Sequence, residues 1–174
     1  MQFRRVLFAG AVLFSCALAT SRAQAALDMF LEIPGVAGES TTAGYENQIN
    51  VLAWSFGGSK VECGGGLNLQ YLSLTKYADK STVDLHAAMA AGTVFPTITL
   101  RVVRPAGPVT QSLQLSNATV TSISTGGSGG EDRLTENVTF YFSQVTITYT
   151  YVDGSGKAGS PESTTIVVPA CTGP

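Results

Sequence analysis

The stretch Ser124–Phe142 reads STGGSGGEDRLTENVTFYF and decides the fold, because a glycine-rich, charged loop passes directly into alternating apolar and polar residues. In its second half Val138, Phe140 and Phe142 fall on one side of an extended chain, which predicts a strand. Phosphate-binding loops and nucleophile elbows place such glycines before a helix instead. The match of Gly126–Gly130 to the G-x-S-x-G pattern therefore predicts no hydrolase.

Strand patterns continue on both sides of this stretch. After Phe142 the apolar residues change parity, which predicts a β-bulge at Ser143 and Gln144 within one long strand. A bulge bends a strand, as closure of a barrel requires. Alternation and β-branched residues predict further strands at 28–33, 49–56, 67–77, 98–102, 113–115 and 164–168. The expected fold is mainly β, a two-sheet β-barrel or sandwich.

Helix signals occur at one place. Ser81 is a candidate N-cap with Asp84 three residues later, the residues up to Ala91 favour helix, and Gly92 suits the left-handed C-terminal position. We expect one short helix at about 82–91, flanking the barrel. The single histidine, His86, has no nucleophile or carboxylate at triad spacing and is expected to be a partly buried structural residue.

The first 25 residues have the three parts of a secretory signal peptide. Arg4 and Arg5 precede the apolar run Val6–Ala19, and Ala23-Gln24-Ala25 is a small-residue cleavage site. The run is too short to span a membrane. We expect a signal peptide at 1–25, a single domain at 26–174, and an exported product in the periplasm or outside the cell.

The charge of the chain argues against two classes of partner. Three of the ten basic residues, Arg4, Arg5 and Arg22, lie in the leader, while all twelve acidic residues follow it, so the mature chain is acidic. Binding to nucleic acid or to an anionic membrane calls for a basic surface, and neither partner is expected. No His, Cys, Asp and Glu residues have metal-site spacing, and no cofactor or catalytic residue is predicted.

The cysteines leave one pair in the mature chain. Cys16 lies in the leader, so Cys63 and Cys171 remain, in a chain directed to an oxidising compartment. A disulfide across so long a loop would stabilise the fold by about 4 to 5 kcal/mol in the chain-entropy model. Two free thiols are the alternative.

The segment Ser124–Phe140 resembles the signature of the hemolysin-coregulated protein (Hcp) family. Asp28–Leu31 resembles the opening of that family, Ile49–Ser55 its second strand, and Leu72–Thr82 its approach to the helix. These matches follow one another in order and cover about 28–152. The resemblance implies a two-sheet β-barrel with one flanking helix, which forms hexameric rings that stack into the inner tube of the type VI secretion system.

The resemblance also implies what the protein does and which residues it uses. It implies a conduit and carrier for secreted effector proteins, with a spike protein as a further partner, and no enzymatic activity. Two loops are then expected to make contacts within and between rings. Their residues are Glu39, Ser40, Tyr45 and Glu46 in the first loop, and Gly126, Gly127, Ser128, Gly129, Gly130, Glu131, Asp132 and Arg133 in the second.

Two features depart from the family pattern. Gly44-Tyr45-Glu46 stands where the family has a histidine before the glutamate, and the usual Gly-Trp ending is absent. The leader is the larger difference, because tube subunits assemble in the cytoplasm. One alternative is an exported paralogue that acts as a secreted binding or adhesion module outside the injection machine. Another is a true start near Leu27, with a product that is cytoplasmic before secretion.

Overall fold

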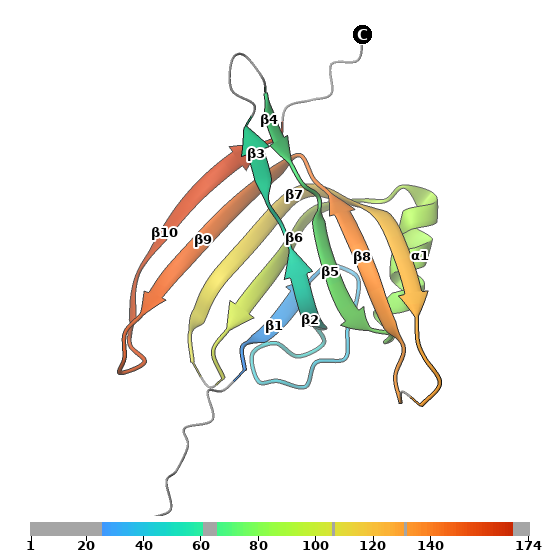
Figure 1. Ribbon diagram of the computed structural model, residues 1–174, viewed down its shortest axis with the longest axis horizontal. Helices are drawn as coiled ribbons and strands as arrows, with labels where there is room; N and C mark the ends of the chain where they lie inside the picture. Colours follow the sequence, from blue (N-terminus) through green and yellow to red (C-terminus); the bar gives the residue numbers. More distant parts are fainter. Residues whose placement is uncertain (1–25, 61–65, 106, 131, 169–174) are drawn as a thin grey trace, which may run out of the picture.

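The computed structural model describes residues 26–60, 66–105, 107–130 and 132–168 (Figure 1). This part of the chain forms one helix and ten strands. They are β1 (Asp28–Glu32), β2 (Ile49–Ser55), β3 (Gly58–Lys60), β4 (Leu67–Leu69), β5 (Leu72–Tyr77), α1 (Ser81–Ala91), β6 (Val94–Val103), β7 (Val109–Gly126), β8 (Thr135–Tyr141), β9 (Gln144–Val152) and β10 (Ala158–Val167).

Six strands close into a barrel. Eight strands form one antiparallel sheet in the order β10-β9-β7-β6-β1-β2-β5-β8, and β8 pairs back onto β7. The 18-residue β7 makes this possible, because residues 111–116 pair with β9 and residues 119–126 pair with β8. The predicted β-barrel with one flanking helix is confirmed. Strands β9 and β10 extend beyond it on one flank, and we call this pair the wing (Figure 1).

The barrel interior is filled by the apolar residues that alternate along the strands. In β5 and β8 every second residue is buried, so Leu72, Leu74, Val138 and Phe140 point inward. Fully buried partners come from the other strands, namely Leu31, Ile49, Ile98, Leu100, Leu113, Leu115 and Val145. Burial of each such side chain contributes about 1.5 to 3 kcal/mol. The same alternation leaves polar residues on the outer face.

The predicted bulge at Ser143 and Gln144 is a corner between two strands. Strand β8 ends at Tyr141, and β9 begins at Gln144 with a different set of neighbours. The Ser143 N–H donates to the Ser116 carbonyl at 3.0 Å, which fixes the corner against β7. The parity change in the sequence thus marks a change of strand partners. The prediction of one long bulged strand is wrong.

The predicted strand at 67–77 is divided in two. Its first part, β4, pairs with β3, and its second part, β5, belongs to the barrel. The break lies at Gln70, whose N–H donates to the Gly57 carbonyl at 2.8 Å. Within the part of the chain that the structure describes, strands β3 and β4 pair only with each other, and they form an arm that projects from one end of the barrel (Figure 1).

Helix α1 is confirmed, with a different N-terminal cap. Lys80 occupies the N-cap position without a side-chain capping bond, and Asp79 accepts the Ser81 N–H at 3.0 Å and its hydroxyl at 2.5 Å. Asp79 thus does what was predicted of Ser81. Gly92 ends the helix at φ 63°, as predicted. His86 is exposed, so the expectation of partial burial is wrong.

Candidate assembly surfaces

The first loop, residues 34–48, is held in one shape by its own backbone. Gly38 donates to the Asn47 carbonyl at 2.7 Å, Ser40 donates to that of Gln48 at 3.0 Å, and Asn47 donates back to Ser40 at 2.9 Å. The two sides of the loop approach so closely at Gly38 that a Cβ there would lie 2.3 Å from the Gln48 carbonyl oxygen. Only glycine fits this position. The loop is a folded element of the barrel rim.

Three of the four residues predicted in this loop have partners within the chain. Ser40 is buried, at 5% exposure, and Tyr45 stacks on Phe30 with ring centroids 4.4 Å apart. Glu39 is exposed, and its carboxylate accepts the Lys80 N–H at 3.1 Å, which helps to cap the N-terminus of α1. Glu46 is exposed.

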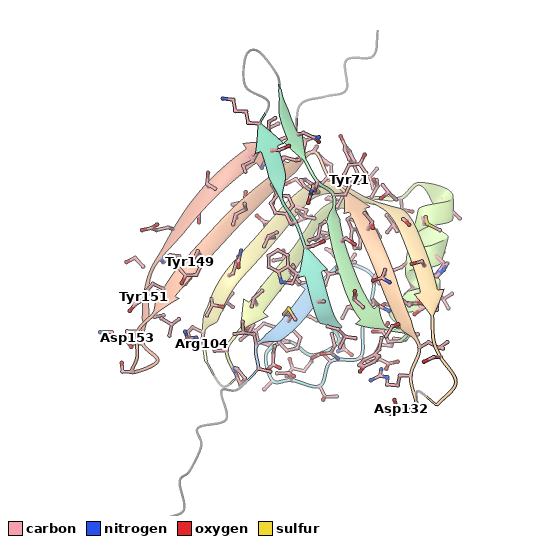
Figure 2. All side chains as sticks on the ribbon, in the orientation of Figure 1. Tyr71, Arg104, Asp132, Tyr149, Tyr151 and Asp153 are labelled. Atoms are coloured by element: carbon pink, nitrogen blue, oxygen red, sulfur yellow. The ribbon has the colours of Figure 1, made fainter. Side chains whose placement is uncertain are left out.

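The second loop has an exposed tip on a fixed base. Gly126–Gly130 and Asp132 are exposed, and Glu131 lies outside the described residues. At the base, the Arg133 guanidinium lies 4.4 Å from the centre of the Tyr77 ring, a cation–π contact. Ala78 also donates to the Leu134 carbonyl at 2.9 Å. The cation of Arg133 is thereby directed toward β5, while the carboxylate of Asp132 remains solvated (Figure 2).

A buried ionic cluster lies between the second loop and α1. The Lys76 ammonium is fully buried and lies 2.8 Å from the Glu136 carboxylate and 3.0 Å from that of Asp79. It also donates to the Tyr77 carbonyl at 2.8 Å, and the Thr82 hydroxyl donates to Glu136 at 2.9 Å. Because the cation is surrounded by acceptors, its burial is tolerated. The cluster joins β5, β8 and the start of α1.

Sequence reasoning missed this cluster, although a signal for it exists. Lys76 has the same parity in β5 as Leu72 and Leu74, and Glu136 has the same parity in β8 as Val138 and Phe140. Opposite charges on the buried sides of two strands predict an ion pair only if the strands are neighbours in the sheet. Strands β5 and β8 are neighbours, and Lys76 lies opposite Glu136.

Three of the predicted features fall on residues that the structure does not describe. They are Cys63, Cys171 and the leader at 1–25. Among the residues that the structure describes, no three His, Cys, Asp or Glu side chains are grouped to hold a metal ion. No helix in the same ranges has both the length and the apolar character needed to cross a membrane. The described surface offers shaped loops, an arm and a wing.

These features define a small β-barrel protein with two structured loops, the β3–β4 arm and the β9–β10 wing on its surface. A family model described as "Type VI secretion system effector, Hcp" matches residues 30–149. Over 149 residues the chain is 45% identical to protein hcp1 of Pseudomonas aeruginosa, covering 78% of this chain and 91% of that protein. The chain belongs to the Hcp family, as its resemblance in sequence implied.

Solved structures agree with this assignment. One is described as a type six secretion system protein and matches with a TM-score of 0.74 at 30% identity, covering 79% of this chain and 92% of the other. A type VI secretion system effector from Yersinia pestis matches with a TM-score of 0.70 at 26% identity, covering 81% and 100%. Hcp1 from Salmonella typhimurium, at 24% identity and a TM-score of 0.71, shows the same fold, with 82% and 95% covered.

Proposed function

We propose that this protein is a tube subunit of a type VI secretion system, which forms hexameric rings and acts as a conduit and carrier without enzymatic activity. One observation carries the proposal: 45% identity to protein hcp1 over 91% of that protein's length. The family match at 30–149 includes the first loop, the second loop and nearly all of the barrel that holds them. Secreted effector proteins and a spike protein are the partners that this role requires.

The first and second loops are the surfaces that we propose for contacts between rings. Glu46 in the first loop and Asp132 in the second are exposed, and the bonds beneath them keep both loops in place. Preorganised loops lose little conformational entropy on association, which favours assembly. Ser40 and Tyr45 support this surface from within the first loop.

The oligomeric state and the secretion phenotype together test this function. The purified protein should give a native mass of six subunits, and deletion of its gene should abolish effector release by the injection machine of the source cell. Complementation with the full chain should restore release. A clean monomer at high concentration, or normal release without the gene, would contradict the proposal.

Export by a signal peptide stays a separate proposal. N-terminal sequencing of the protein recovered from each compartment distinguishes the alternatives, because cleavage after Ala25 gives an N-terminus at Ala26. A start near Leu27 would instead place the protein in the cytoplasm before secretion. An N-terminus at Met1 on the secreted protein would contradict both.

The disulfide between Cys63 and Cys171 is likewise a proposal, since it requires an oxidising compartment. Intact mass and peptide mapping without reductant test it. The expected result is a Cys63–Cys171 linked peptide that disappears on reduction. Alkylation of both thiols in the unreduced, unfolded protein would contradict it.

A further inference from the structure

The ionic cluster of Lys76, Glu136 and Asp79 occupies positions that apolar residues could fill. Lys76 and Glu136 point into the barrel from β5 and β8, and each is 0% exposed. The other inward positions of these two strands hold apolar side chains. Because replacement of a buried ion pair by well-packed apolar residues is often neutral or stabilising, the stability of the barrel gives no reason for charges here. Charged groups differ from apolar ones in direction, since hydrogen bonds and ion pairs fix the orientation of the groups that they join.

The cluster holds both ends of the second loop. Its Glu136 carboxylate accepts the hydroxyl of Thr125, the residue before the loop, at 3.2 Å. At the other end, the Lys76 ammonium donates to the Tyr77 carbonyl at 2.8 Å, and the centre of the Tyr77 ring lies 4.4 Å from the Arg133 guanidinium. Both ends of the loop are therefore within one or two contacts of the same buried charges.

The cluster is also connected to α1 and to the first loop. Asp79 lies 3.0 Å from the Lys76 ammonium, and its carboxylate accepts the Ser81 N–H at 3.0 Å. Lys80, which lies between Asp79 and Ser81, donates its N–H to the Glu39 carboxylate of the first loop at 3.1 Å. These three consecutive residues therefore join the buried charges to the start of α1 and to the first loop.

We propose that the ionic cluster is a positioning element for assembly, which fixes the first loop, the second loop and the start of α1 in one relative arrangement. Its replacement by apolar residues would leave the barrel folded and the two loops misplaced. Loops that are fixed before association lose less conformational entropy, so the cluster favours assembly through the loops that it holds. Lys76 and Glu136 are positioning residues, because their burial keeps them from direct contact with another copy. The inference rests on the proposed function, in which both loops make contacts between rings.

An apolar replacement of the ion pair separates positioning from stability. Lys76→Met with Glu136→Leu removes one charge of each sign, and Asp79 keeps its bond to the N-terminus of α1. The midpoint of urea unfolding should stay close to that of the wild type. The assembled fraction, measured by analytical ultracentrifugation at fixed concentration, should fall about tenfold or more. The same changes at the exposed ion pair, Arg101→Met with Glu32→Leu, are the matched control and should alter neither quantity. Wild-type assembly, or a large loss of stability, in the Lys76 and Glu136 variant would overturn the inference.

A single hydroxyl tests the link to the second loop while the ion pair stays in place. Thr125→Val keeps the branched shape of the side chain and removes the donor to Glu136, so it should lower the assembled fraction by about fivefold, which corresponds to the loss of one hydrogen bond. Thr121→Val is the matched control on the same strand, because the Thr121 hydroxyl donates to the Thr139 carbonyl, outside the cluster, at 3.1 Å. Circular dichroism should show both variants folded. Equal assembly of the two variants refutes the positioning role and leaves the proposed function intact, whereas a wild-type chain that stays monomeric refutes both.

Discussion

Glu39 in the first loop caps α1 through Lys80, whose backbone N–H it meets at 3.1 Å. The two residues are 41 positions apart, so this bond ties a loop to a helix across the rim of the barrel. It adds a second acceptor at the N-terminus of α1, beside Asp79, which accepts the next N–H, that of Ser81. The first loop and the start of α1 are therefore linked at this end of the barrel.

Removal of this acceptor should loosen the start of α1. Glu39→Ala should lower the free energy of unfolding by about 1 kcal/mol, as loss of a capping side chain does. Faster amide exchange should be confined to the first turn of α1 and the first loop. Glu39→Gln retains an acceptor oxygen and should lose less. Equal effects of the two substitutions on urea unfolding would contradict the capping role.

Gly38 should tolerate no side chain. Its Cβ would lie 2.3 Å from the Gln48 carbonyl oxygen, so Gly38→Ala must separate the two sides of the first loop. We expect a loss of about 2 kcal/mol or more in stability, because the loop's backbone bonds break with the clash. Gly126→Ala is the control, since no atom lies within 4 Å of the Cβ position there. Chemical denaturation measures both, and similar losses would contradict the packing argument.

The ionic cluster should be intolerant of a missing cation. Lys76→Ala leaves the carboxylates of Glu136 and Asp79 buried without their partner, which should cost about 3 to 5 kcal/mol. Lys157→Ala is the control and should change stability by less than about 0.5 kcal/mol, because the Lys157 side chain is exposed. Thermal and urea unfolding measure both. A near-neutral Lys76→Ala would show that the cluster is dispensable.

Local patterns predicted the parts of the fold that depend on neighbouring residues in the chain. The parity of Val138 and Phe140 predicted β8, and Gly92 predicted the end of α1. The corner at Ser143 could not be predicted, because the parity change reports a new set of strand partners and a single sequence does not name partners. The first half of β10, Ala158–Ser163, has no alternation and is a strand because it pairs with β9.

For the two loops, the sequence likewise predicted where they lie in the chain and did not predict their contacts. The position of the second loop followed from its glycines, and the first loop lies between the strands predicted at 28–33 and 49–56. The burial of Ser40 and the bond from Lys80 to Glu39 did not, since each depends on contacts across the fold. The burial of Lys76 could not be predicted from the sequence. Alternation along β5 predicts that its side chain faces inward, whereas lysine is rarely buried. Its side chain is buried because the carboxylates of its neighbours compensate its charge.

The turn between β9 and β10 should respond to acid through Asp153. The Ser155 hydroxyl and the Lys157 N–H donate to its carboxylate at 2.6 and 2.9 Å, and these bonds lower the pKa of Asp153 below its ordinary value of 3.8. A pKa that is lower in the folded state than in the unfolded chain stabilises the fold above about pH 4, and this contribution is lost as pH falls through the folded value. Asp153 is partly exposed, so salt should weaken the effect.

Asp153→Asn isolates that contribution, because the amide keeps one acceptor oxygen and cannot titrate. We expect the amides of the turn to exchange faster as the wild-type protein is acidified from pH 5 to pH 2, and the variant to lack this step. Asp132→Asn is the matched control, since Asp132 is an exposed loop aspartate outside this turn, and its pH profile should follow that of the wild type. Hydrogen exchange resolved by residue provides the measurement. Identical profiles for wild type and Asp153→Asn would show that the hydrogen bonds at Asp153 do not hold the turn, and that pairing with β9 alone sets its stability.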